Sequence, residues 1–239
     1  MIKNYPILVY FQAKGRAELS RLIFACGDVS FNDQRLSFED YEKIRSSGEL
    51  PFGQLPILKL GDTVISQSCA IARYAAKQAG LYPIDPLQAA RSDMIVDAWR
   101  DLQDLLYGCY VDRVVEQGQF IMTFREPSVQ VKRLNEYFAT SVPMHLEKFE
   151  QIITQNQDAS FLVGSSLTWA DIAVFDLLCI YNHTGKFWND PTAFSYIPEP
   201  DGPYQPPKDL LQPYPNLETL KNTVSQIPQI TTWLQAHPY

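Results

Sequence analysis

The first seventy residues place polar side chains at two positions that suit recognition of a charged ligand. Gln67 and Ser68 begin a predicted helix, where backbone N–H groups attract a carboxylate and the Ser68 hydroxyl adds a donor. Ser68 could equally serve as a plain helix cap. Tyr41 and Arg45 lie four residues apart in a polar helical stretch, so they share one helix face, and an arginine can pair with a carboxylate through two hydrogen bonds.

Tyr10 and Arg16 flank the turn after the first apolar run. From the residues alone, Tyr10 is an aromatic at a strand end, which core packing explains, and Arg16 is a surface arginine. The three histidines have no ligand spacing, so a metal site is not expected. The four cysteines form no CxxC motif and predict reduced, mostly buried thiols: Cys26, Cys69, Cys109 and Cys179.

The first eighty residues alternate between strand and helix patterns. Residues 5–11 predict a buried strand, and Gly15 then opens an apolar-periodic stretch that Gly27 ends. A strand, a polar helix, a hairpin around Gly61-Asp62 and a further helix follow, at residues 31–36, 39–46, 55–65 and 67–79. The order β-α-β-α-β-β-α is too compact for a Rossmann domain.

From Pro86 onward the pattern is helical, and no stretch gives a convincing strand signal. Two apolar stripes at helical spacing predict long helices, the second kinked by Pro143. Thr168 and Asp171 predict a capped helix start, with Leu167 and Ile172 as a hydrophobic staple. The stripes are Ile95, Trp99, Leu102, Leu106, Cys109, and Val131, Leu134, Phe138, Val142, Leu146, Phe149. Two short helices are expected at 216–223 and 228–236.

Residues 191–215 interrupt the helical pattern with eight of the chain's seventeen prolines, so no regular helix is expected there. Phe194, Tyr196 and Tyr204 lie among these prolines, whereas a mobile linker would be rich in glycine and serine. We expect an ordered strap that packs on the helical region, away from the site around Ser68.

Composition narrows the class of protein. The chain is 46% hydrophobic and 20% charged, with a formal net charge of −7. The negative charge and the lack of a basic run argue against nucleic acid or anionic membrane as partners. Neither a membrane-spanning run nor a signal peptide is visible, so a cytoplasmic location is the expectation.

Four segments resemble the tyrosine-type cytosolic glutathione transferases, in order and at family-like spacing. Residues 10–18 (YFQAKGRAE) resemble the first strand-to-helix turn, and residues 51–58 (PFGQLPIL) resemble the loop before the cis-proline. Residues 67–74 (QSCAIARY) resemble the γ-glutamyl-binding turn, and residues 162–178 (LVGSSLTWADIAVFDLL) the capping motif of the sixth helix. The resemblance is closest to the sigma class, which includes prostaglandin D synthase-like members, with the pi, alpha and mu classes related.

This resemblance implies an α/β thioredoxin-like N-terminal domain and an all-α C-terminal helical domain. The first would span residues 1–82 and bind glutathione. The second would span residues 86–239, carry the acceptor-substrate site and hold a proline-rich insertion at about 190–213. The resemblance further implies a homodimer.

The resemblance gives Tyr10 and Arg16 catalytic roles. The Tyr10 hydroxyl would donate a hydrogen bond to the sulfur of glutathione, and Arg16 would add a positive charge that favours the thiolate. A free thiol titrates near about 8.5, so lowering that pKa by about two units, worth roughly 2.7 kcal/mol, would make most of the bound thiol reactive.

The resemblance also assigns the glutathione-binding residues. A cis Leu55-Pro56 bond would offer backbone groups to the peptide, and Gln67 and Ser68 would bind the γ-glutamyl carboxylate. Tyr41 and Arg45 stand where the family usually has the Trp and Lys that hold the glycyl carboxylate. The remaining candidates are Gln54, at the glycyl end, and Asp101, which would reach the ammonium group of glutathione in the partner subunit.

At the subunit interface, Phe52 would insert into the partner as an aromatic key, and Arg73 would pair with Asp93 of the partner subunit. A divalent cation is not expected beside Asp97, because Arg100 replaces one of the acids that hold it in some sigma-class relatives. The expected walls of the acceptor site are Phe11, Ala13, Tyr107 and Tyr110.

The sequence therefore predicts a glutathione transferase that takes glutathione as co-substrate, without a metal, and directs its thiolate at a hydrophobic electrophile. Conjugation, isomerisation and peroxide reduction are all open to one activated thiolate. The alternative is a non-catalytic, crystallin-like or ligand-binding relative that has kept the fold.

Overall fold

The computed structural model of the chain describes residues 5–116, 119–156, 160–182 and 206–237. Four strands form one mixed sheet in the order β2-β1-β3-β4. The central strand β1 runs parallel to β2 and antiparallel to β3, which turns back into β4. The strands β1 to β4 span Ile7–Phe11, Asn32–Leu36, Ile57–Leu60 and Thr63–Ser66.

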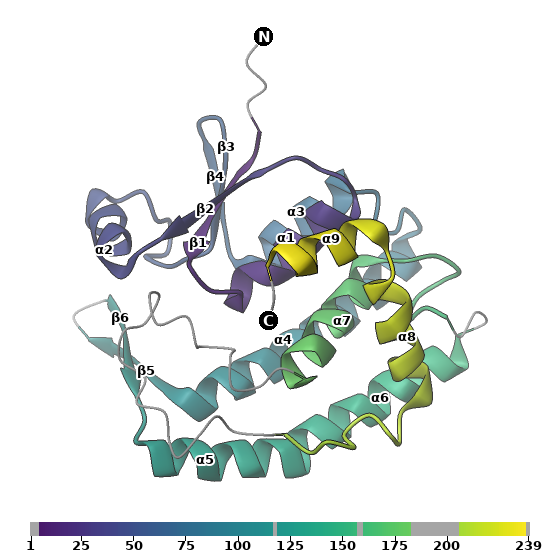
Figure 1. The fold of residues 1–239 in the computed structure, drawn as a ribbon. Helices are drawn as coiled ribbons and strands as arrows, with labels where there is room; N and C mark the ends of the chain where they lie inside the picture. The colour runs from purple at the N-terminus through teal and green to yellow at the C-terminus, as the bar shows by residue number, and fades with distance from the viewer. Residues whose placement is uncertain (1–4, 117–118, 157–159, 183–205, 238–239) are drawn as a thin grey trace.

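Helices cover both faces of this sheet (Figure 1). Successive residues of β1 point to opposite faces. Val9 packs with Leu36 and Ile57 toward α2, whereas Leu8 and Tyr10 join the larger core that includes α1 and α3. Tyr10 is thereby turned toward the helical half of the molecule. Helices α1 to α3 span Glu18–Cys26, Phe38–Ser47 and Ser68–Gln78.

The rest of the described chain is mainly helical. Helix α7 is buried along most of its length and lies between α4 and α8, with its other contacts on α1. Its start is capped as predicted, because Asp171 accepts hydrogen bonds from the backbone N–H and the hydroxyl of Thr168 at 2.7 and 2.8 Å. Helices α4 to α9 span Pro86–Tyr110, Pro127–Glu136, Val142–Gln155, Trp169–Asn182, Pro215–Ser225 and Pro228–Ala236.

The predicted kink near Pro143 is present as an irregular turn. The chain passes from α5 to α6 through one π-helical turn, Tyr137–Ser141. Pro143 has no N–H to donate and its ring crowds the carbonyl four residues earlier, so a wider turn relieves the clash. The apolar stripe continues across the turn, with Phe138 and Val142 both buried.

The expectation of no strand after Pro86 was wrong. Helix α4 ends at Tyr110, and the chain forms an antiparallel pair, β5 (Val111–Glu116) and β6 (Gln119–Phe124). The segment VDRVVEQGQFIMTF is rich in β-branched and aromatic residues on both sides of a glycine, which is a strand composition. Arg125 secures the returning strand, since its Nε donates to the Gly108 carbonyl at 3.0 Å and its guanidinium pairs with Asp112.

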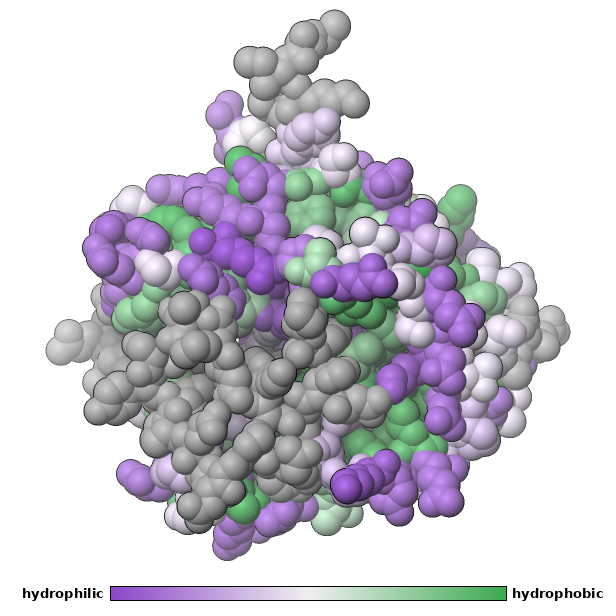
Figure 2. Space-filling view, viewed as in Figure 1, coloured by the Kyte–Doolittle hydropathy of each residue, from purple (hydrophilic) through white to green (hydrophobic). Residues whose placement is uncertain are grey.

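The surface viewed in Figure 2 is mostly hydrophilic over the upper α/β half, with smaller hydrophobic patches between. No helix among the described residues is long and apolar enough to cross a membrane. The expected strap at 191–215 falls for the most part outside the described residues. Its last ten residues, 206–215, lead by short turns into α8.

Candidate active site

Tyr10 lies near the end of β1 and is 5% exposed. Its hydroxyl oxygen accepts a hydrogen bond from the backbone N–H of Arg16 at 3.3 Å. A tyrosine hydroxyl has one proton to donate and lone pairs to accept, so this contact uses an accepting position and leaves the proton available for an acceptor. The turn after β1 thus holds the hydroxyl as a donor.

Gly15 makes the close approach of this turn possible. Its φ is +44°, and a Cβ at this position would lie 2.7 Å from the Tyr10 hydroxyl oxygen and 3.0 Å from that of Tyr107. Both hydroxyls therefore converge on one point beside Gly15. Burial raises the pKa of Tyr107 well above its ordinary value, and the neighbouring Tyr10 adds to the shift, so Tyr107 stays protonated.

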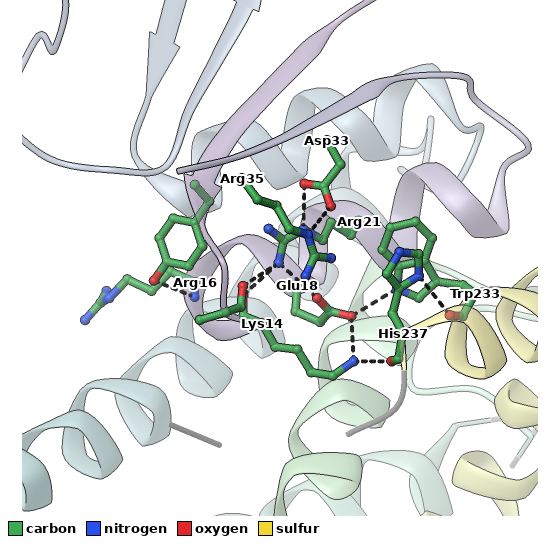
Figure 3. Close-up of polar contacts among 10 residues, drawn as sticks. Lys14, Arg16, Glu18, Arg21, Asp33, Arg35, Trp233 and His237 are labelled. Carbon is green, nitrogen blue, oxygen red and sulfur yellow. Dashed lines mark hydrogen bonds and ion pairs between the residues drawn. The ribbon is translucent and has the colours of Figure 1, made fainter. Parts of the chain in front are cut away.

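Buried charges fix the turn to α1 (Figure 3). The side chains of Glu18 and Arg21 are 1% and 0% exposed and pair at 3.2 Å. Arg21 also donates to the Ala13 carbonyl at 2.7 Å and to Asp33 of β2 at 3.0 Å. Burial acts to raise the pKa of Glu18, but the charges of Lys14 and Arg21 outweigh it and hold that pKa below its ordinary value. Glu18 is thus an ionised carboxylate inside the core.

The last helix closes this cluster from the other end of the chain (Figure 3). The indole N–H of Trp233 donates to Glu18 at 3.0 Å, and the Lys14 ammonium donates to the His237 carbonyl at 2.6 Å. The His237 ring stacks on Trp233 with 3.9 Å between centroids. The turn that carries Arg16 is therefore held by α9 as well as by α1.

The side chain of Arg16 contacts two residues of α4. Its guanidinium lies 4.6 Å from the centroid of the Tyr107 ring and pairs with Asp104 of α4 at 2.5 Å. Arg100 pairs with the same carboxylate at 3.1 Å, and its NH1 donates to the Ser68 hydroxyl at 2.6 Å. One polar network thus runs from the turn beside Tyr10 to the start of α3.

The start of α3 and the loop before β3 have the predicted backbone. Leu55-Pro56 is cis. Gln67 has a φ of +72°, which is rare for a residue with a side chain and recurs at functional sites. Ser68 follows as the first helical residue and is 5% exposed. The unusual backbone at Gln67 therefore adjoins the predicted carboxylate-binding serine.

Tyr41 and Arg45 share a face of α2, as predicted. The Arg45 guanidinium lies 5.8 Å from the centroid of the Tyr41 ring and pairs with Glu42 at 2.9 Å. The Tyr41 hydroxyl donates to the Gly53 carbonyl at 3.1 Å, which ties α2 to the loop that carries Gln54. Gln54 is partly exposed.

At the predicted interface, Phe52 is 60% exposed, and Asp97 and Asp101 are exposed on α4. The pairing of Arg73 was predicted across subunits, but the structure pairs it with Asp93 of the same chain at 3.1 Å. Arg73 and Asp93 lie 20 positions apart, on α3 and α4, which meet within one subunit. Among the residues described, no group of three or more His, Cys, Asp or Glu is placed to hold a metal ion.

The chain's own cysteines are not activated. Burial raises the pKa of Cys26 and Cys109 to about 11 and that of Cys179 to about 12. Burial also raises the pKa of Cys69, against the nearby charge of Arg100. The thiolate is the nucleophilic form of cysteine, so these side chains are poor nucleophiles at neutral pH.

The predicted acceptor-site residues lie beside the same turn. Phe11 and Ala13 are buried at the end of β1 and in the loop after it, with the Phe11 ring 5.4 Å from the Tyr10 ring. Tyr107 is buried on α4, and Tyr110 is partly buried at its end. Phe11 and Tyr107 thus lie beside Tyr10, Ala13 lies in the turn after it, and Tyr110 lies one turn farther along α4.

Comparison with known proteins finds similar sequences and similar structures. Residues 116–237 match the family model described as glutathione S-transferase, C-terminal domain. Hematopoietic prostaglandin D synthase of Gallus gallus is 31% identical over 237 residues, which cover 98% of this chain and 97% of that protein. The chain belongs to the glutathione S-transferase family. Glutathione S-transferase 1 of Ascaris suum is 30% identical over 231 residues, covering 97% and 96%.

A solved glutathione S-transferase structure from Ascaris lumbricoides matches with a TM-score of 0.72 and 28% identity, covering 98% of each chain. The thioredoxin-like N-terminal domain and the helical C-terminal domain are thus those of the transferase fold. The sequence reasoning missed two features of this transferase, the link from Arg100 to Ser68 and the cluster around Glu18. For the link from Arg100 to Ser68, the signal in the sequence was the pair of opposite charges on Arg100 and Asp104, four residues apart on one helix.

Proposed function

We propose that this glutathione transferase activates glutathione through the Tyr10 hydroxyl. The observation that carries the proposal is the turn after β1, where the Arg16 N–H occupies an accepting position of the hydroxyl and leaves its proton to donate. Since the buried cysteines of the chain are poor nucleophiles, the attacking sulfur is that of bound glutathione.

In the proposed reaction, a hydrogen bond from Tyr10 stabilises the glutathione thiolate, which attacks an electrophilic carbon of a hydrophobic acceptor. A carbon–sulfur bond forms, and the displaced group leaves with its electron pair or, in an addition, the carbanion takes a proton. Isomerisation and peroxide reduction start from the same thiolate. The resemblance to prostaglandin D synthases of several animals favours isomerisation as a second activity.

We further propose that the cis-proline loop and the start of α3 bind the peptide. The Leu55 backbone would pair with the cysteinyl residue, and Gln67 and Ser68 would bind the γ-glutamyl carboxylate. Tyr41, Arg45 and Gln54 would hold the glycyl end, and Asp101 of the partner subunit the ammonium group. The domain boundaries 1–82 and 86–239, a homodimer and a cytoplasmic location belong to the same proposal.

Replacing Tyr10 by phenylalanine tests the assignment, because it removes the donor and keeps the ring. Glutathione affinity should change little, while the pKa of the bound thiol should rise by one unit or more in an ultraviolet titration of the thiolate. Tyr5→Phe is the matched control, since Tyr5 precedes the same strand and is 47% exposed. An unchanged titration curve in Tyr10→Phe would refute the role, and a wild-type protein without turnover would favour a crystallin-like binder.

The dimer proposal is tested at Phe52. If each site uses Asp101 of the partner subunit, Phe52→Ser should weaken both self-association and glutathione binding, as sedimentation and calorimetry would report. Met144→Ser is the control, because Met144 is 55% exposed on α6. A stable dimer with normal affinity would make Phe52 a local surface residue.

A further inference from the structure

Arg100 occupies a position from which it can touch a ligand bound at Ser68. Its side chain is 24% exposed and lies between α4 and the first turn of α3. Asp104, one turn later on α4, accepts from its Nε through both carboxylate oxygens, at 3.1 and 3.2 Å. The guanidinium is therefore held in one orientation, with NH1 directed at the Ser68 hydroxyl at 2.6 Å.

The hydrogen bond between these two residues has a fixed direction. A guanidinium has only donors, so the Ser68 oxygen must accept from Arg100. The proton of the Ser68 hydroxyl is then left to donate to a third group. A guanidinium N–H and a serine O–H that lie side by side form a pair of donors, and a carboxylate with its two oxygens is the complementary acceptor.

The network of Arg16, Arg100 and Asp104 is itself positive, although the negative charge of Asp97 also acts near the start of α3. Arg16 and Arg100 share the single carboxylate of Asp104, so this network carries one excess positive charge. Asp97 and Asp101 neighbour Arg100 on α4, but in the part of the chain that the structure describes neither forms an ion pair with it. Burial acts to raise the pKa of Asp104, and the charges of Arg16 and Arg100 overcome it and lower that pKa, so the carboxylate stays ionised.

We propose that Arg100 binds the α-carboxylate of the γ-glutamyl residue of glutathione, together with Ser68, and that Asp104 positions its guanidinium. The inference rests on the proposed function, which places that carboxylate at Ser68. Arg100 is then a substrate-binding residue that recognises the amino-acid end of the peptide, far from the sulfur.

The test removes the Arg100 guanidinium and the α-carboxylate of glutathione, first separately and then together. Calorimetry measures the affinity of the full chain for glutathione and for 4-aminobutyryl-cysteinyl-glycine, which is glutathione without that carboxylate. Wild type should bind the analogue about tenfold or more weakly, the range for a hydrogen bond to a charged group. Arg100→Gln should lose about as much affinity for glutathione and should discriminate far less between the two peptides, whereas Arg100→Lys should retain part of the discrimination.

Arg91→Gln is the matched control, because it removes the same charge from an exposed position of the same helix. It should bind both peptides as wild type does. If Arg100→Gln weakens both peptides by the same factor, Arg100 only ties α4 to α3 and the proposal is overturned, as it also is if neither affinity changes. A wild-type protein that binds no glutathione would overturn the proposed function itself.

Discussion

At the thiol side of the proposed site, the turn after β1 is held by the buried pair of Glu18 and Arg21 and by contacts from α9. At the acceptor side, α4 ends at Tyr110 and the chain turns into the β5–β6 pair. The first side serves a co-substrate common to the family and is built from charges locked in the core. The second is built where a helix gives way to a two-stranded pair. We therefore expect substitutions on the thiol side to cost more stability than substitutions on the acceptor side.

Breaking the buried pair should have the largest effect on the thiol side. Glu18→Ala leaves Arg21 without one of its partners in the core, so the free energy of unfolding should fall by about 3–5 kcal/mol. Denaturant titration measures the change. Glu39→Ala is the control, because Glu39 pairs with Lys43 while 81% exposed and should cost well under about 1 kcal/mol. Equal losses would mean that the core pair contributes no special rigidity.

The same pair gives a dependence on pH. Because its pKa is lowered in the folded state, Glu18 contributes full stability above its unfolded pKa of about 4.3, and the contribution is lost as the pH falls through the lower folded value. The difference in unfolding free energy between wild type and Glu18→Ala should therefore shrink below about pH 4. A difference that stays constant to pH 2 would contradict this.

Adding a side-chain atom at Gly15, in the turn after β1, should have an intermediate effect on stability. Gly15→Ala places a Cβ 2.7 Å from the Tyr10 hydroxyl oxygen, so we expect a cost of about 1–3 kcal/mol for overpacking, added to that of a positive φ. The pKa of bound glutathione should rise as Tyr10 is displaced. Gly48→Ala separates the two causes, because Gly48 has a φ of +80° and its Cβ would meet nothing within 4 Å. Only Gly15→Ala should alter the thiol titration.

A substitution on the acceptor side should have the smallest effect, and the size of that effect should depend on the acceptor substrate. Tyr107→Phe removes a hydroxyl beside Tyr10 but leaves the ring under Arg16, so kcat/KM should change by about two- to tenfold, by amounts that differ between acceptors. Glutathione affinity should stay the same. Tyr110→Phe, one turn away, is the comparison. Identical changes for every acceptor would place Tyr107 on the thiol side instead.

The local parts of this structure could be predicted from the sequence. The strand that contains Tyr10, the helix that Gly27 ends, the cis Leu55-Pro56 bond and the Thr168–Asp171 cap each depend on residues close in the chain or on a recognisable motif. The contact of Arg100 with Ser68 spans 32 positions, and that of Trp233 with Glu18 spans 215, so no periodicity reports them. The β5–β6 pair was not predicted, because it is a short segment between two strong helical patterns, although its own composition favours strands.

The contact between Trp233 and Glu18 has a consequence for how the protein is made. A ribosome produces residue 18 long before residue 233, and N-terminal domains generally fold first during synthesis. Until the last helix emerges, Glu18 lacks the indole donor, and Lys14 lacks the carbonyl of His237. The nascent N-terminal domain would therefore carry an incompletely satisfied charge, and the turn beside Tyr10 would gain its last contacts only after α9 has been synthesised.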